Sequence, residues 1–205
     1  LAKLVYLDCE QDGSFSDEAI SNAISEKTKF AAIGLVSNVL GRRNPVEKII
    51  KLVHEKGGVV LVDAAQAVLH ETVDVTALDA DFLAFSGHKM MAPMGIGVLY
   101  GKEALLEVMP PFLTGGEMIE SVTREDAAYA GLPHKFEAGT VNGAGAVGLA
   151  AAIDYMNGIG MDAIQKREAE LTKMLFDSMS KIPYVHILGS KKPEEHGGIL
   201  SFVID

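Results

Sequence analysis

Short apolar runs separated by a helical pattern constrain the fold of this chain more than any other feature of its sequence. Residues 30–36 and 59–62 are nearly continuous apolar runs, as expected for strands that are covered on both faces of a sheet. Between them, apolar residues recur with helical spacing over residues 46–53, and a Gly-Gly pair follows. We expect this helix to begin with Asn44 as its N-cap and Pro45 at its first position. Strands that alternate with a helix of this length predict an α/β fold with a largely parallel sheet.

Similar patterns extend over the rest of the chain. They predict strands at 4–7, 82–85, 96–100, 184–188 and 198–204, and helices at 102–108, 142–157 and 161–182. Residues 112–140 show no clear period, so we expect a long loop that is functional or mobile. A boundary near Gly158 divides the chain into a partial large domain, residues 1–158, and a second part, residues 159–205. This second part is expected to be a linking helix and the beginning of a small α+β C-terminal domain.

The composition excludes several classes of protein. Hydrophobic residues make up 48% of the chain and charged residues 22%, which is ordinary for a folded globular protein and unlike a disordered one. With 18 Lys and Arg against 28 Asp and Glu, the net charge of −10 argues against a nucleic-acid partner. No run approaches the roughly 20 apolar residues that span a bilayer, so we expect no membrane partner. The single Cys9 excludes an intrachain disulfide and indicates a reducing compartment such as the cytoplasm.

Both ends of the sequence lie in strand-like stretches. The chain opens at Leu1 without a signal pattern and soon enters an apolar run, and it stops at Asp205 within another. Natural chains seldom begin or end inside hydrophobic strands, because such ends leave sheet edges unpaired. We therefore interpret the chain as an internal fragment of a longer protein.

Polar residues follow two of the predicted strands directly. Asp63 ends one apolar run, and Ser86, His88 and Lys89 follow the run at 82–85. Taken alone, these are an ordinary turn or capping aspartate and an exposed lysine in a glycine turn. Together, at strand ends where open α/β sheets bind ligands, they match the needs of pyridoxal phosphate. A partly desolvated lysine forms a Schiff base, a carboxylate keeps the pyridine nitrogen protonated, and hydroxyl and imidazole groups hold the phosphate.

Several ordered motifs resemble the class V aminotransferase superfamily and, within it, the Suf-type (group II) cysteine desulfurases. The motifs are VSNVLG at 36–41, VDAAQ at 62–66, FSGHKM at 85–90, GIGVLYG at 95–101, GGEM at 115–118 and FEAGT at 136–140. The resemblance covers nearly the whole chain, and the matching order and spacing of several motifs make it specific. It implies the fold type I of pyridoxal-phosphate-dependent transferases, with a largely parallel central sheet and flanking helices.

The resemblance assigns roles around the cofactor residue by residue. Lys89 and its neighbour His88 are the expected catalytic residues. Lys89 would form the Schiff base with the cofactor aldehyde and later move the proton at the α-carbon of the substrate. Asp63 would pair with the pyridinium nitrogen and sustain the ring as an electron sink, and Gln66 would donate to its phenolic oxygen.

The remaining implied contacts involve the phosphate and the substrate. Ser86 and His88 would hold the phosphate, while Thr140 would reach the phosphate of the neighbouring subunit across a homodimer interface. Asn38 would lie near the cofactor and the substrate carboxylate. No metal site is expected, because the other histidines show no ligand spacing and are interpreted as surface or capping residues: His54, His70, His134, His186 and His196.

The activity implied by the resemblance is that of a cysteine desulfurase. Such an enzyme removes sulfur from L-cysteine and leaves L-alanine and an enzyme persulfide, which a Suf-system acceptor protein receives for iron–sulfur cluster assembly. In this family a ring-stacking histidine and a phosphate loop precede this region, and the sulfur-accepting cysteine and a carboxylate-binding arginine lie beyond Asp205. The fragment alone is therefore expected to be inactive, and Cys9 to be a packed or incidental thiol.

Two alternative functions remain open. Another class V enzyme, such as a selenocysteine lyase acting on L-selenocysteine, is the alternative within enzymes. The alternative outside enzymes is an α/β scaffold fragment that binds no cofactor.

Two further motif matches are rejected. Residues 143–148 satisfy G-x-G-x-x-G but follow no buried strand, so we interpret their glycines as allowing close helix packing. Residues 86–89 satisfy S-x-x-K, but Gly87 and Pro93 oppose the helical turn that this motif needs.

Overall fold

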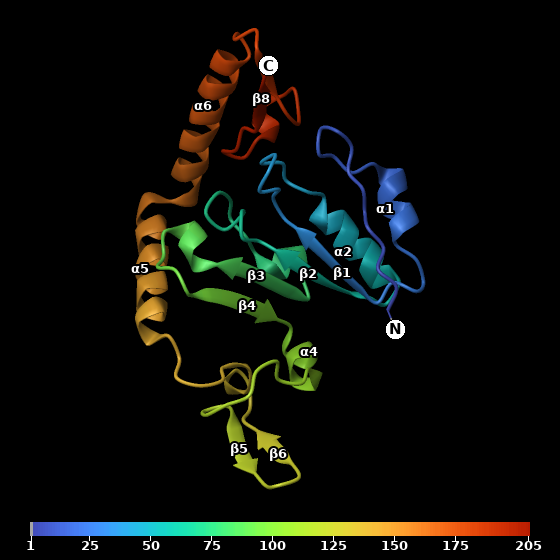
Figure 1. Ribbon diagram of the computed structural model, residues 1–205, viewed down its shortest axis with the longest axis vertical. Helices are drawn as coiled ribbons and strands as arrows, with labels where there is room; N and C mark the ends of the chain where they lie inside the picture. The colour runs from blue at the N-terminus through green and yellow to red at the C-terminus, as the bar shows by residue number, and fades with distance from the viewer. Residues whose placement is uncertain (1) are drawn as a thin grey trace.

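A four-stranded mixed sheet forms the centre of the computed structural model, which describes residues 2–205. Its strands are β1 (Phe30–Gly34), β2 (Val59–Asp63), β3 (Phe82–Ser86) and β4 (Gly97–Gly101), paired in that order. β1, β2 and β3 run parallel, and β4 pairs antiparallel with β3 (Figure 1). The expected α/β fold with a largely parallel sheet is confirmed, and each strand falls on its predicted apolar run.

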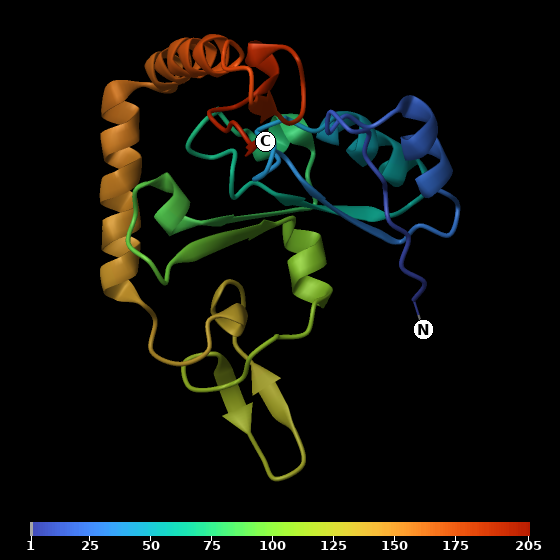
Figure 2. The ribbon, with the colours of Figure 1, turned by 45° about the horizontal axis from the view of Figure 1, so that its top comes forward.

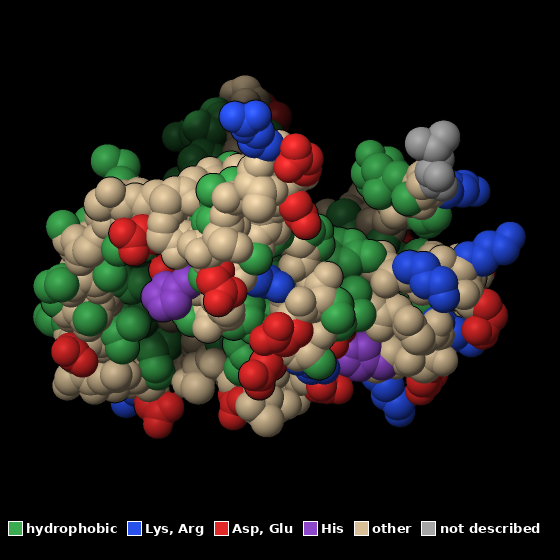
Figure 3. All heavy atoms as spheres, turned by 90° about the horizontal axis from the view of Figure 1, so that it is seen from below, with side chains coloured by type: hydrophobic (Ala, Val, Ile, Leu, Met, Phe, Trp, Pro, Cys, Tyr) green, Lys and Arg blue, Asp and Glu red, His purple; other side chains and the backbone are tan. Residues whose placement is uncertain are grey.

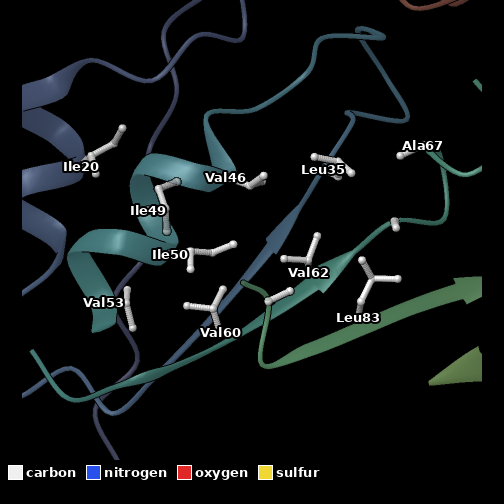
Figure 4. Packing of buried hydrophobic residues seen from close by; sticks show 12 residues of the cluster. Ile20, Leu35, Val46, Ile49, Ile50, Val53, Val60, Val62, Ala67 and Leu83 are labelled. Atoms are coloured by element: carbon white, nitrogen blue, oxygen red, sulfur yellow. The ribbon is translucent and has the colours of Figure 1, made fainter. Parts of the chain in front are cut away.

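Helix α2 (Val46–Glu55) covers one face of this sheet together with α1 (Asp17–Ala23), as Figure 2 shows with the sheet nearly edge-on. The apolar residues of α2 that recur with helical spacing are all buried: Val46, Ile49, Ile50 and Val53. They pack against β2 residues such as Val60 and Val62, and Ile20 of α1 joins the same cluster (Figure 4). This layer confirms the predicted helix and forms the main hydrophobic core.

The start of α2 differs from the prediction. Pro45 occupies the cap position without a side-chain cap, and Val46 is the first helical residue. The Asn44 side chain instead donates from Nδ2 to the Gly34 carbonyl, 2.8 Å away, and so ties the loop after β1 to the end of that strand. A contact with the strand therefore replaces the local cap that asparagine usually provides.

Short helices complete the body of the molecule. α3 (Val75–Leu78) begins at Asp74, whose side chain accepts the amides of residues 76 and 77, and α4 (Glu103–Val108) lies on the face of the sheet opposite α2 (Figure 2). Single 3₁₀ turns are η1 (Gly87–Met90), η2 (His134–Phe136) and η3 (Pro193–Glu195). The predicted helix at 102–108 is confirmed as α4, whereas the sequence pattern indicated neither α1 nor α3.

The region expected to be one long loop, residues 112–140, contains an antiparallel hairpin. β5 (Ile119–Val122) and β6 (Ala127–Tyr129) pair with each other and project from the body of the molecule (Figure 1). The Thr123 amide closes the turn between them by donating to the Asp126 carbonyl at 2.8 Å. The expectation of an irregular loop is wrong in this part, because such short strands show no alternation in the sequence.

Two long helices connect the sheet to the C-terminal strands. α5 (Gly143–Ile159) runs beside the sheet, and α6 (Met161–Met179) follows it after Gly160, whose φ of 87° favours glycine (Figure 1). β7 (Val185–Ile187) and β8 (Phe202–Ile204) form a separate antiparallel pair. The strand predicted at residues 4–7 is wrong: the structure shows no strand in this segment. Within residues 2–205, no helix is both long and apolar enough to cross a membrane.

The surface of α5 is apolar on more than one side. Leu149, Ala152 and Met156 are buried, but Val147 and Tyr155 are 73% and 60% exposed. Figure 3 shows hydrophobic side chains gathered on the side of the molecule that carries this helix. A helix with apolar residues around most of its circumference is typical of a protein interior.

A buried carboxylate lies at the edge of the sheet where β2 and β3 begin. Asp81 is 5% exposed and accepts from the Val60 amide and from His54 Nε2, both at 2.7 Å, while Lys102 Nζ lies 2.8 Å away. Burial by itself raises the pKa of Asp81, but the hydrogen bonds from Lys102, His54 and the Val60 amide outweigh it and lower the pKa. This polar cluster joins α2, β2, β3 and the residue that precedes α4.

The interpretation of His196 as a surface or capping residue is wrong. Its side chain is nearly enclosed, with the residue 4% exposed, and both ring nitrogens face backbone carbonyls. One of these carbonyls belongs to Leu40, which is far away in the sequence, so no local pattern could indicate the contact. Among the described residues, His, Cys, Asp and Glu form no group of three that could hold a metal ion.

Candidate active site

The parallel strands bring the predicted site residues to one edge of the sheet. Because β1, β2 and β3 point the same way, their carboxyl ends and the loops that follow lie side by side. The register pairs Asp63 with Gly34 of β1 and with Ala84 of β3. Asp63 is therefore the last residue of the middle strand and stands at the centre of this edge.

A cavity of about 370 Å³ opens at this edge. Four of the predicted site residues line it: Asn38, Asp63, Gln66 and Lys89. Asp63 ends β2, and the other three lie in the segments that follow β1, β2 and β3. Residues up to 51 positions apart, Asn38 and Lys89, therefore meet around one space. The structure thus brings these four predicted site residues together, and their roles stay predictions.

The Asp63 carboxylate is only half engaged by the protein. Its Oδ1 atom accepts from the Ala65 amide at 2.9 Å, which fixes the side chain at the start of the turn after β2. Its other oxygen forms no hydrogen bond or ion pair with residues 2–205. Asp63 is thus both the local turn aspartate that its position suggests and an acceptor available to a ligand.

Lys89 lies on η1, directly after β3, and is half-buried. The turn passes close to the beginning of β4, since a Cβ atom at Gly87 would lie 2.7 Å from Ile96 Cγ2. Only glycine permits this approach, which places the lysine one turn after the strand end. The expectation that Gly87 prevents a helical turn here is wrong, because residues 87–90 form a 3₁₀ helix.

Ser86 and His88 form a pair beside this lysine. The Ser86 Oγ and His88 Nδ1 atoms are 2.7 Å apart, so the hydroxyl and the imidazole orient each other. His88 is exposed and Ser86 is half-buried, and neither belongs to the lining of the cavity. Thr140 is exposed and also lies outside this lining, so its contact with a neighbouring subunit stays a prediction.

The N-terminal segment contributes residues to the cavity that the sequence did not indicate. Cys9, Gly13 and Phe15 line it together with Lys89 and Asp63. Cys9 is exposed, so it is not a packed thiol, and its alternative role as an incidental thiol stays a prediction. The segment that carries Cys9 has no regular structure and no motif, which left no signal in the sequence for this placement.

The chemistry of these groups fits pyridoxal phosphate. The cavity presents a primary amine on Lys89, a free carboxylate oxygen on Asp63 and the amide of Gln66. An amine, an acid and an amide donor correspond to the aldehyde, the pyridine nitrogen and the phenolic oxygen of that cofactor. The oriented hydroxyl and imidazole of Ser86 and His88 are donors suited to a phosphate.

Comparison with known proteins gives consistent matches over the whole length. A probable cysteine desulfurase of Streptomyces coelicolor is 50% identical over 203 residues, which cover 99% of this chain and 49% of the relative. A cysteine desulfurase of Haloferax volcanii is 44% identical over 204 residues, covering all of this chain and 48% of the relative. The chain therefore spans about half the length of the curated relatives it matches.

Solved structures of cysteine desulfurases share the fold. CsdA of Escherichia coli, in its S-sulfonic acid form, superposes with a TM-score of 0.91 at 34% identity, covering 98% of this chain and 49% of that one. The apo enzyme of Thermococcus onnurineus gives a TM-score of 0.93 at 37% identity, covering 98% and 50%. The model of the aminotransferase class-V family matches residues 1–205 without interruption, and the chain belongs to this family, whose members depend on pyridoxal phosphate.

Proposed function

We propose that the intact protein is a pyridoxal-phosphate-dependent cysteine desulfurase, which converts L-cysteine to L-alanine and leaves the sulfur as an enzyme persulfide. The observation that carries the proposal is the convergence of Asn38, Asp63, Gln66 and Lys89 on one cavity at the carboxyl edge of the sheet. Relatives that are 44–50% identical and bear the name cysteine desulfurase support the choice of reaction.

Pyridoxal phosphate, when bound, supplies a carbonyl carbon that amines attack and a ring that accepts electrons from the substrate α-carbon. The Lys89 amine would hold the cofactor at its aldehyde and would move the proton at the α-carbon of the substrate. The free Asp63 oxygen holds a proton at the pyridine nitrogen, and Gln66 donates to the phenolic oxygen. Asn38 orients the carboxylate of the substrate.

The phosphate and the second subunit complete the proposed site. Ser86 and His88, already oriented by their mutual hydrogen bond, donate to the phosphate. Thr140, which is exposed, reaches the phosphate of the partner in a homodimer. We extend the proposal to a cytoplasmic enzyme that passes its sulfur to a Suf-system acceptor for iron–sulfur cluster assembly.

Sulfur transfer requires a thiolate that attacks the substrate sulfur. An S–S bond forms as the Cβ–S bond of the substrate breaks, and the electron pair stays with the carbon, which takes up protons to give alanine. We assign this thiolate to a part of the intact protein outside residues 1–205. Cys9 is the single cysteine of the chain and lines the cavity, so it is the necessary control.

Spectroscopy and turnover of the full-length protein test the proposal. The purified protein should be yellow, and borohydride should fix the cofactor to Lys89. Lys89→Ala should lower alanine production from cysteine by at least about 100-fold, the usual contribution of a positioned proton-transfer group. Cys9→Ala should retain activity. A Lys89→Ala protein with more than a tenth of wild-type turnover would contradict the assignment, and loss of turnover in Cys9→Ala would move the thiolate to Cys9.

A further inference from the structure

The loop that carries Asn38 is held from its far side by a segment of the C-terminal part of the chain. This loop, residues 37–44, connects β1 to α2, and the segment comprises residues 195–201. Three consecutive loop carbonyls each accept a hydrogen bond from the segment: Val39 from Ser201 Oγ at 2.5 Å, Leu40 from His196 Nδ1 at 3.1 Å, and Gly41 from the Gly197 amide at 2.8 Å. Every carbonyl in this stretch is therefore engaged by a distant part of the sequence.

Charge and close packing strengthen the same contact. Arg42 donates to Glu195 at 2.8 Å and to Asp12 at 3.2 Å, which joins both segments to the N-terminal loop. Gly41 has a φ of 67°, and a Cβ atom there would lie 2.9 Å from the Gly197 nitrogen. The two backbones thus approach so closely that only glycine fits at the crossing.

His196 is the centre of this contact. It is 4% exposed, with Nδ1 at 3.1 Å from the Leu40 carbonyl and Nε2 at 2.9 Å from the Ser190 carbonyl. A carbonyl oxygen only accepts, so both bonds form together only when both ring nitrogens carry protons. The neutral ring has one N–H and would turn a nitrogen lone pair toward a carbonyl oxygen. The geometry therefore matches the imidazolium form.

Charged groups near His196 are mostly engaged with one another. On α6, the ring of Phe176 lies 5.6 Å from the imidazole, centroid to centroid. His196 also lines a cavity of about 710 Å³. The ionisable groups of this cavity are Glu194 and the paired residues Arg42–Glu195, Arg43–Glu71 and His70–Glu168, together with Lys173, which pairs with Asp177 outside the lining. The two carbonyls are thus the hydrogen-bond partners of the His196 ring, and an imidazolium satisfies both.

We propose that His196, in its doubly protonated form, is a positioning residue that ties the Asn38 loop to the C-terminal segment. Loss of one ring proton breaks one of the two bonds and so weakens the tie. The tie itself stands on the contacts above, and its effect on substrate binding rests on the proposed function. Without the tie, Asn38 would hold the substrate carboxylate less firmly.

Hydrogen exchange of the cofactor-free, full-length protein measures the tie without any turnover. Amides within the loop are hydrogen-bonded, for example Gly41 to the Ser37 carbonyl at 3.0 Å, so a loosened loop exchanges faster. At pH 6 the wild-type peptide covering residues 37–44 should be protected, and a variant that cannot donate to both carbonyls should exchange roughly tenfold faster. His196→Arg, which stays charged and keeps several donors, should stay protected.

A third variant and a control isolate the role of the imidazole. His196→Gln should lose protection, because its amide cannot donate in both directions. His186→Gln is the matched control, since His186 is an exposed histidine of the neighbouring strand β7, and its protection of the loop should equal that of wild type. Wild-type protection in His196→Gln, or a loss in His196→Arg as large as in His196→Gln, overturns the proposal.

Two further measurements separate this inference from the proposed function. The ring ¹⁵N shifts of His196 in the wild-type protein report both protons at pH 6 if the inference is right, and a neutral ring at pH 6 overturns it even if every variant unfolds. In the active enzyme, the KM for cysteine should be higher in His196→Gln than in wild type and in His196→Arg, while kcat stays the same in all three. If hydrogen exchange behaves as described but the Lys89→Ala enzyme is active, the proposed desulfurase function is refuted and the proposal for His196 stands.

Discussion

Replacing the buried Asp81 with alanine is expected to destabilise the protein by about 2–4 kcal/mol. The Val60 amide donates to the Asp81 carboxylate at 2.7 Å, and Val60 is 0% exposed. The substitution removes this acceptor, and water cannot replace it. An unpaired buried amide costs about 1–3 kcal/mol, and this is the largest contribution. His54 and Lys102 lose less, because each keeps Asp79 as a partner, at 3.3 Å and 2.6 Å.

Two asparagine variants, which keep the shape of the aspartate side chain, separate the contributions to this loss of stability. Asp81→Asn keeps an oxygen for the Val60 amide but not the charge, so we expect a loss of about 1–2 kcal/mol. Asp79→Asn, at a side chain that is 64% exposed, should cost less than about 1 kcal/mol. Urea unfolding followed by circular dichroism at pH 6 measures all three variants against wild type.

The pH dependence provides the stricter test. Because the native state lowers the pKa of Asp81, its carboxylate stabilises the fold fully above the unfolded value of about 3.9 and loses this contribution as the pH falls through the folded value. The difference between wild type and Asp81→Asn should therefore be constant near pH 6 and shrink below about pH 4. A difference that stays the same down to pH 3, or an Asp81→Ala variant within about 0.5 kcal/mol of wild type, would refute the reasoning.

Two further pairs of variants test the packing of the helices. Gly148→Ala should lower Tm although alanine favours helices, because its Cβ atom would lie 2.6 Å from Pro93 Cγ, whereas Gly158→Ala meets nothing within 4 Å. Gly158→Ala should therefore raise stability by up to about 1 kcal/mol. Tm shifts of the same sign in the two variants would contradict the explanation by the contact with Pro93. Ile50→Ala, at a core position, should cost about 2–5 kcal/mol in urea unfolding. Lys51→Ala, on the exposed face of α2, should stay within about 0.5 kcal/mol, and equal losses would contradict the packing in Figure 4.

The sequence predicts the sheet and its site edge well because both depend on short-range patterns. Continuous apolar runs mark strands buried on two faces, and the helical spacing in α2 marks the face that packs on them. Parallel strands place the residues that follow them at one edge of the sheet, so the sequence alone predicts that Asp63 and Lys89 meet there. The family resemblance added Asn38 and Gln66 to this edge.

What the sequence does not reveal depends on contacts between distant segments. Asn44 has a capping sequence but bonds to Gly34, and His196 looks like a surface histidine but is enclosed by residues 40 and 190. Cys9 reaches the cavity on a segment without regular structure. In each case a local preference is overruled by a partner whose position only the folded chain determines.

The apolar circumference of α5 has a practical consequence for any work on residues 2–205 alone. Val147 and Tyr155 on this helix, together with Leu99 at 54% exposure on the edge strand β4, present a water-facing surface with the character of an interior. Surfaces of this kind promote association between molecules, and the associated fraction increases with protein concentration. Light scattering on a dilution series should precede every stability measurement on this segment, because an unfolding midpoint that moves with concentration reports association as well as folding.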